Sequence, residues 1–156
     1  MRVLSLFSGA GGMDLGFKRA GFEIAWANDN YQDAVETYRR NLGNHVVAGD
    51  IADVDAGGLP EAEVVIGGFP CQGFSVANIE RSPHDGRNKL YLEFVRVVRE
   101  KQPKYFVAEN VKGLLSLADG EILKTVLSDF ASVGYRVMYA LLNAADFGVP
   151  QRRERV

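Results

Sequence analysis

The only cysteine of the chain, Cys71, lies within the segment GGFPCQGFS, residues 67–75. It follows a short apolar run, residues 64–66, that is typical of a buried strand. A Pro-Cys step at the end of a strand would place the thiol at the edge of a sheet, where open α/β folds bind their ligands. A free thiol is more often a buried structural group. The start of a loop is an unusual place for such a group, so Cys71 is a candidate nucleophile.

Glu109 is the second candidate for chemistry, and it directly follows the apolar run 105–108. Apolar neighbours predict a partly buried carboxyl group. Burial raises the pKa of a carboxyl and suits it to donate a proton. An ion pair with Arg153 or Arg155 is an alternative role that is compatible with the first.

Three further segments follow predicted strands and could contact a nucleotide-like ligand. They are a glycine turn at residues 7–12, Asp29 and Asp50. Taken alone, the glycine turn is as consistent with a plain tight turn as with a nucleotide site. Taken alone, Asp29 is consistent with a helix-capping residue or a solvated side chain. At three consecutive strand ends, they together predict a pocket for an adenosine-like molecule.

Strand-like and helix-like segments alternate around these residues. We expect strands at 3–7, 23–27, 45–48, 63–69, 105–108 and 135–142, and helices at 13–20, 32–41, 90–101 and 121–133. This order predicts an α/β fold with a doubly wound, mostly parallel sheet. The polar stretch 72–88 shows little periodicity and predicts a long loop, which is usually functional.

Length and composition set limits on these hypotheses. The chain has 156 residues, 47% hydrophobic and 24% charged, which indicates one globular domain at most. A single cysteine excludes an internal disulfide and a Cys-rich zinc site, which fits a reducing cytoplasm. We see no leader segment and no apolar run of about 18 residues, so no membrane partner is expected. The net charge of −2 argues against a complete DNA-binding protein, although residues 81–89 and 152–155 are locally basic.

Four segments, taken in chain order, resemble the cytosine-5 DNA methyltransferases. LFSGAGG (6–12) is similar to the cofactor loop of that family, GFPCQGFS (68–75) to its nucleophile motif, ENV (109–111) to its second catalytic motif and QRRER (151–155) to its Gln-x-Arg-x-Arg motif. The resemblance covers essentially the whole chain. It implies that residues 1–156 form a Rossmann-like, S-adenosylmethionine-dependent methyltransferase fold.

The resemblance implies S-adenosylmethionine as the cofactor and no metal. Asp29 would hold the ribose, Asp50 with Ile51 the adenine, and the turn glycines the methionine part. The implied cofactor-contacting residues are Phe7, Ser8, Gly9, Gly11, Gly12, Asp29, Asn30, Asp50, Ile51, Gly68, Pro70 and Leu90.

The resemblance also implies a mechanism on double-stranded DNA. The Cys71 thiolate would attack C6 of a flipped cytosine while Glu109 donates to N3. Arg153 and Arg155 would hold the base or its phosphate and favour the thiolate. Four polar residues would contact the DNA, namely Gln72, Ser75, Arg87 and Gln151, and the loop 72–88 would close over the base.

The chain departs from the family after the last motif. The family continues into another central strand, a target recognition domain and a final motif, whereas this sequence stops at Val156. We therefore expect an inactive fragment of a longer protein, or one half of a split enzyme that a second chain completes, and we favour the fragment. The fifth strand would then be an open sheet edge.

The resemblance further implies a bacterial or archaeal, cytoplasmic enzyme of restriction-modification type. Two alternatives stay open: a transfer RNA cytosine-5 methyltransferase, and a catalytically silent module that only binds S-adenosylmethionine. In addition, QRRER would place Gln151, Arg153 and Arg155 on one face of a strand if it is extended throughout.

Overall fold

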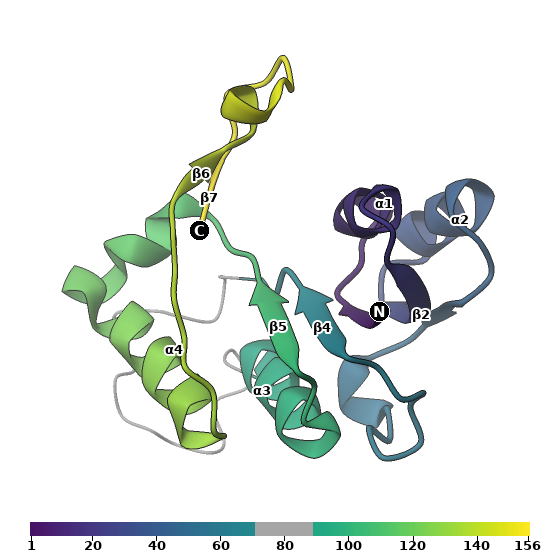
Figure 1. The fold of residues 1–156 in the computed structure, drawn as a ribbon, viewed down its shortest axis with the longest axis horizontal. Helices are drawn as coiled ribbons and strands as arrows, with labels where there is room; N and C mark the ends of the chain where they lie inside the picture. Colours follow the sequence, from purple (N-terminus) through teal and green to yellow (C-terminus); the bar gives the residue numbers. More distant parts are fainter. Residues whose placement is uncertain (71–88) are drawn as a thin grey trace. The chain divides into compact units, whose positions relative to one another are not determined.

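The computed structural model describes residues 1–70 and 89–156 of the chain. The chain divides into two compact units (Figure 1). The sheet unit comprises Met1–Phe69 and Leu92–Ala108, and the hairpin unit comprises Pro70–Tyr91 and Glu109–Val156. In neither described stretch is there a helix with the length and apolarity needed to cross a membrane.

The sheet unit is built on five parallel strands. They are β1 (Arg2–Leu6), β2 (Glu23–Asp29), β3 (Val46–Ala48), β4 (Val64–Gly67) and β5 (Tyr105–Ala108). Their order in space is β3-β2-β1-β4-β5, and every pairing is parallel. The order reverses between β1 and β4, so their carboxyl ends form the switch point at which such sheets bind ligands. The predicted doubly wound sheet is confirmed.

Helices cover both faces of this sheet. One face carries α1 (Gly12–Arg19), whose Met13 and Phe17 pack against the buried Val64 and Ile66. A second apolar cluster joins α2 (Gln32–Asn41) to β2 and β3. On the other face, Phe94 of α3 (Lys89–Lys101) meets Phe106 of β5 edge-on, with ring centroids 6.2 Å apart. Successive side chains of a strand point to opposite faces, so α1, which packs on Val64 and Ile66, and α3, which packs on Phe106, cover opposite faces of the sheet.

Strand β5 forms one edge of the described sheet. Tyr105 and Val107 lie in register with Val64 and Ile66 of β4, so these four side chains share one face. The β4 pair is buried, whereas Tyr105 is 62% exposed and Val107 43%. Apolar surface is thus open beside the fifth strand.

The hairpin unit contains mostly short elements. It holds η3 (Lys112–Leu115), η4 (Leu117–Gly120), α4 (Glu121–Ser132), β6 (Leu142–Asn143), η5 (Ala144–Phe147) and β7 (Glu154–Arg155). The buried face of α4 carries Val126 and Phe130, and the Tyr91 hydroxyl donates to Asp129 at 2.9 Å. Strands β6 and β7 pair antiparallel as a two-stranded ribbon (Figure 1).

The prediction of a sixth strand at 135–142 is wrong. Only Leu142 and Asn143 are extended as a strand, and they pair with β7 rather than with the parallel sheet. Met138 and Tyr139 are 83% and 58% exposed. Strand propensity is realised only where a neighbouring strand supplies pairing and packing, and no described strand pairs with 135–141. The other predicted elements agree with the structure to within two residues at each end.

Candidate functional site

The turn after β1 has a strained backbone at the carboxyl end of the sheet. Phe7 and Gly9 both have left-handed conformations, with φ of 54° and 53°. The N–H of Ser8 donates to the carbonyl of Asn28 at 2.9 Å, and that of Gly11 to the carbonyl of Ser8 at 2.9 Å. A bulky residue such as Phe7 rarely adopts positive φ, and such strain collects at ligand-binding sites.

Asp29 fixes this turn. Its Oδ2 accepts a hydrogen bond from the N–H of Gly9 at 2.7 Å, and its Oδ1 accepts one from the N–H of Tyr31 at 2.9 Å. Because α2 begins after Tyr31, Asp29 does not cap that helix. An ionised carboxylate has about four acceptor positions, so Asp29 can still accept hydrogen bonds from a ligand hydroxyl.

The turn also offers open space and a polar atom without a partner. The Oγ of Ser8 is buried and has no hydrogen-bond partner within the described part of the chain. Beyond the adjoining backbone, no heavy atom of the described residues lies within 4 Å of where a Cβ on Gly9 or Gly12 would stand. Gly11 differs, because a Cβ there would clash with the side chains of Leu42 and Tyr38. Gly11 therefore allows close packing on α2, whereas Gly9 and Gly12 leave room beside the turn.

The end of β3 is linked to the end of β2. The Asn28 side chain donates to the carbonyls of Val47 at 3.2 Å and Gly49 at 3.0 Å, and the N–H of Gly49 donates to the carbonyl of Asp29 at 3.1 Å. Asp50 follows at once, and it is exposed. The structure therefore brings together the three strand ends that the sequence singled out.

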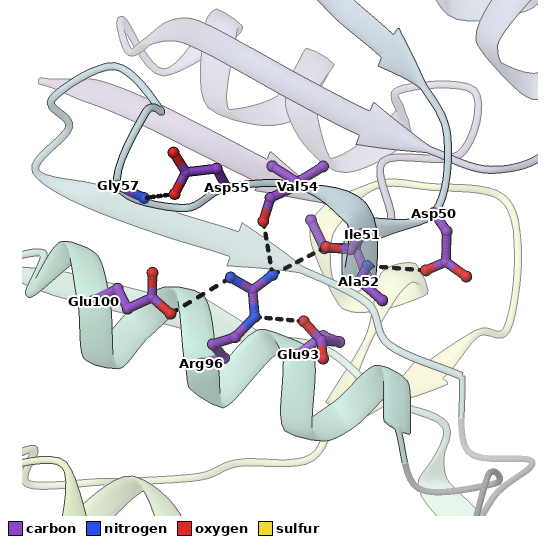
Figure 2. A network of polar contacts seen from close by, with 9 residues as sticks. All are labelled: Asp50, Ile51, Ala52, Val54, Asp55, Gly57, Glu93, Arg96 and Glu100. Carbon is purple, nitrogen blue, oxygen red and sulfur yellow. Dashed lines mark hydrogen bonds and ion pairs between the residues drawn. The ribbon is translucent and has the colours of Figure 1, made fainter.

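Asp50 begins a short turn, η1 (Ile51–Asp53), and its Oδ1 accepts from the N–H of Ala52 at 3.0 Å. The side chain of Ile51 is 2% exposed. From α3, Arg96 donates to the carbonyls of Ile51 and Val54 at 3.0 and 3.1 Å (Figure 2). This attachment of the turn was not foreseen from the sequence.

Four cofactor candidates remain, two in each unit. Asn30 is exposed after β2, and Gly68 is half-buried after β4. Pro70 is exposed and Leu90 half-buried, and both belong to the hairpin unit. Their roles stay predictions.

A buried polar network beneath the glycine turn was missed by the sequence reasoning. Asp14 of α1 is 0% exposed and accepts from the Ser5 and Tyr38 hydroxyls, each at 2.7 Å. The Tyr38 hydroxyl lies 3.0 Å from Nε2 of His45. Burial raises the pKa of Asp14 and of Tyr38, and burial lowers that of His45. The sequence did contain one signal for this network: Asp14 is an acidic residue that directly follows the apolar Met13 in α1.

The hairpin unit contains the second catalytic candidate, Glu109, in an ion pair. Its Oε1 lies 2.8 Å from Nε of Arg155, and the side chains are 32% and 28% exposed. Backbone pairing sets this contact: Val111 bridges antiparallel to Arg155, and Asn110 and Val156 exchange two hydrogen bonds of 2.9 Å. Of the two arginines weighed as partners for Glu109, the structure selects Arg155.

The predicted alternation along QRRER is wrong, since only Glu154 and Arg155 form a strand. The N–H of Arg153 donates to the Asn143 side chain at 3.0 Å, and its carbonyl accepts from Ala144 at 3.0 Å. Gln151 and Arg153 are exposed. The segment 151–153 is thus held by hydrogen bonds to Asn143 and Ala144 and not by strand pairing. Gln151 therefore does not share a strand face with Arg155.

Four site candidates lie outside the described residues: Cys71, Gln72, Ser75 and Arg87, together with the predicted loop 72–88. Their roles rest on the sequence alone.

A family comparison decides what these two sites belong to. The profile of the C-5 cytosine-specific DNA methylases matches residues 1–156. The chain belongs to this family. Two curated relatives are a Type II methyltransferase, M.FnuDI, from Fusobacterium nucleatum, 48% identical over 156 residues, and another, M.NgoFVII, from Neisseria gonorrhoeae, 46% identical over 157.

The alignments cover 100% and 99% of this chain but only 45% and 42% of those relatives, so the chain spans less than half their length. Among solved structures, a protein named as a prophage-encoded DNA modification methyltransferase from E. coli superposes with a TM-score of 0.82 at 34% identity. That alignment covers 99% of this chain and 44% of the other. The fold is therefore the Rossmann-like fold of S-adenosylmethionine-dependent methyltransferases, and the family implies a methyl donor.

Proposed function

We propose that the protein containing this chain is a DNA (cytosine-5) methyltransferase that uses S-adenosylmethionine. The supporting observation is a family match over all 156 residues, together with a glycine turn at the carboxyl end of the sheet that has open space beside Gly9 and Gly12. In that turn the N–H of Gly9 is held by Asp29, and Ser8 Oγ is buried without a partner in the described structure.

The residues of the sheet unit fit the proposed cofactor. Asp29 retains acceptor positions for ribose hydroxyls, and Asp50 Oδ1 makes a single 3.0 Å contact while the residue stays exposed. Space beside Gly9 and Gly12 would admit the methionine part, and Ser8 Oγ would gain a hydrogen-bond partner. When bound, S-adenosylmethionine supplies an electrophilic methyl group.

The chain's own groups would prepare the cytosine for methylation. The Cys71 thiolate forms a bond to C6 of a flipped base while Glu109 donates a hydrogen bond or proton to N3. Electron density then rises at C5, which takes the methyl group. Water then takes the C5 proton as the bond from Cys71 to C6 breaks, which restores the aromatic ring and releases the Cys71 thiolate, and the proton on N3 returns to Glu109.

The two arginines of the last motif would have different tasks. Arg155 holds the Glu109 carboxyl in one orientation through the 2.8 Å contact. Arg153 is exposed, and only its backbone is engaged within the described residues. It would therefore meet the phosphate or the base of the DNA, as would Gln151, Gln72, Ser75 and Arg87.

Sequence-specific recognition would need more than these 156 residues. Because the chain spans 45% of M.FnuDI, we propose that a further part of the same protein, or a second chain, supplies it. Because these relatives come from bacteria, the enzyme would act in the cytoplasm of a bacterium or archaeon. Residues 1–156 would then be its cofactor-binding and catalytic domain.

Transfer of labelled methyl groups tests the proposal. The whole protein is incubated with labelled S-adenosylmethionine and with either duplex DNA or transfer RNA. Label in C5 of DNA cytosine is expected. Label in transfer RNA alone would favour an RNA enzyme, and cofactor binding without transfer to either substrate would indicate a silent binding module.

A further inference from the structure

Arg96 of α3 makes contacts that reach well beyond its own helix. Its Nη2 donates to two backbone carbonyls of the β3–β4 connection, those of Ile51 at 3.0 Å and Val54 at 3.1 Å. Its Nε contacts Glu93 at 2.6 Å, and its Nη1 contacts Glu100 at 3.5 Å. Figure 2 shows the guanidinium between the helix and this connection, with every dashed contact directed to one or the other.

These contacts tie the η1 turn to α3. The carbonyl of Ile51 accepts from the N–H of Val54 at 3.2 Å, and Arg96 Nη2 gives it a second donor. The same Nη2 also donates to the carbonyl of Val54, just after η1, so Arg96 binds the turn at both of its ends. A guanidinium is planar and rigid, so the ion pairs with Glu93 and Glu100 both balance its charge and set its orientation. The Arg96 side chain is only 27% exposed, which strengthens each contact relative to one in water.

The turn that Arg96 holds includes both residues assigned to the adenine. Asp50 accepts from Ala52 at one end of η1, and Ile51 contributes the carbonyl that Arg96 binds. We propose that Arg96 is a positioning residue for the nucleoside part of the cofactor, acting through the 50–54 turn. This inference rests on the proposed function.

Lys101 of the same helix provides a matched control. Its Nζ donates to the carbonyl of Leu59 at 3.0 Å and pairs with Glu61 at 2.8 Å, so it also ties α3 to the β3–β4 connection. It does so outside the 50–54 turn. Removing Lys101 loosens the connection without releasing the residues assigned to the adenine.

The experiment compares Arg96→Met, Arg96→Lys and Lys101→Met in the whole protein. Calorimetry with S-adenosylhomocysteine gives the Kd, and steady-state methyl transfer gives KM for S-adenosylmethionine and kcat. Arg96→Met should raise Kd and KM about tenfold and leave kcat nearly unchanged, because each lost contact is a hydrogen bond from a charged donor. The Arg96→Lys variant should fall between, since one ammonium nitrogen cannot replace three guanidinium nitrogens that contact Glu93, Glu100 and the two carbonyls. Lys101→Met should bind as the unchanged protein does.

A second comparison keeps the inference testable if Arg96→Met folds poorly. Asp50→Ala is measured alone and together with Arg96→Lys, and the two losses of affinity should be strongly non-additive because both act through one turn. Additive losses, an unchanged Kd in Arg96→Met, or an equal loss in Lys101→Met would each overturn the inference while the proposed function stands. Absence of S-adenosylhomocysteine binding by the unchanged protein would instead overturn the proposed function, and this inference with it.

Discussion

Replacing Tyr38 by Phe should destabilise the protein out of proportion to the single oxygen that is lost. The Tyr38 hydroxyl donates to Oδ2 of Asp14 at 2.7 Å, and both residues are 0% exposed. A hydrogen bond to a charged group contributes about 1.5–3 kcal/mol, and a buried partner left short of a donor adds a desolvation penalty. We therefore expect a loss of about 2–3 kcal/mol in the free energy of unfolding.

Tyr31→Phe is the matched control for this prediction. The Tyr31 hydroxyl also donates to an aspartate, Asp33, at 3.2 Å, but Tyr31 is 63% exposed. Water replaces that partner readily, so we expect a change within about 0.5 kcal/mol. Urea unfolding of the whole protein, with amide hydrogen exchange in α1 and α2 as a local readout, measures both variants.

A double-mutant cycle decides whether the loss comes through Asp14. In an Asp14→Asn background, Tyr38→Phe should cost much less, since no buried carboxylate remains to lose its donor. Equal losses for Tyr38→Phe and Tyr31→Phe, or an unchanged Tyr38→Phe loss in the Asp14→Asn background, would refute the reasoning.

Three further outcomes follow from the described contacts. Burial lowers the pKa of His45 below its ordinary 6.5, so His45 is protonated in the unfolded chain before it is protonated in the folded chain as the pH falls. The contribution of neutral His45 to stability is therefore complete above pH 6.5 and declines below it. Denaturation measured at several pH values should show a smaller decline for His45→Gln. Glu109→Gln should lower single-turnover methyl transfer by about 10²–10⁴ with cofactor affinity unchanged, and a normal rate would exclude proton donation by Glu109. Gly9→Ala and Gly21→Ala, both at positive φ in open space, should each cost about 1–2 kcal/mol of stability, but only Gly9→Ala should weaken S-adenosylhomocysteine binding in calorimetry.

Features encoded by neighbouring residues were predictable from the sequence. The apolar run before each turn, and the glycines or aspartates after it, located the strand ends and hence Asp29 and Asp50. The order of strands and helices was sufficient for the doubly wound sheet. Glu109 and Arg155 were paired as one of two alternatives, because the motif gave both residues but not their register.

Features that depend on distant partners were not predictable. Asp14 is satisfied by Tyr38, 24 residues away, and Arg96 binds a carbonyl 45 residues away. Neither partner is marked by any local pattern. The strand prediction at 135–142 failed for the converse reason: its apolar residues suit a strand, but no described strand pairs with residues 135–141.

The central claim is that Cys71 is the nucleophile of a cytosine-5 methyl transfer. Duplex DNA containing 5-fluorocytosine tests it directly, because fluorine at C5 cannot leave as a proton does and the enzyme stays bound to the base. With S-adenosylmethionine, the whole protein should form a denaturant-stable complex with this DNA, and Cys71→Ala should form none. An equal complex with Cys71→Ala, or methylated DNA without any trapped complex, would contradict the account.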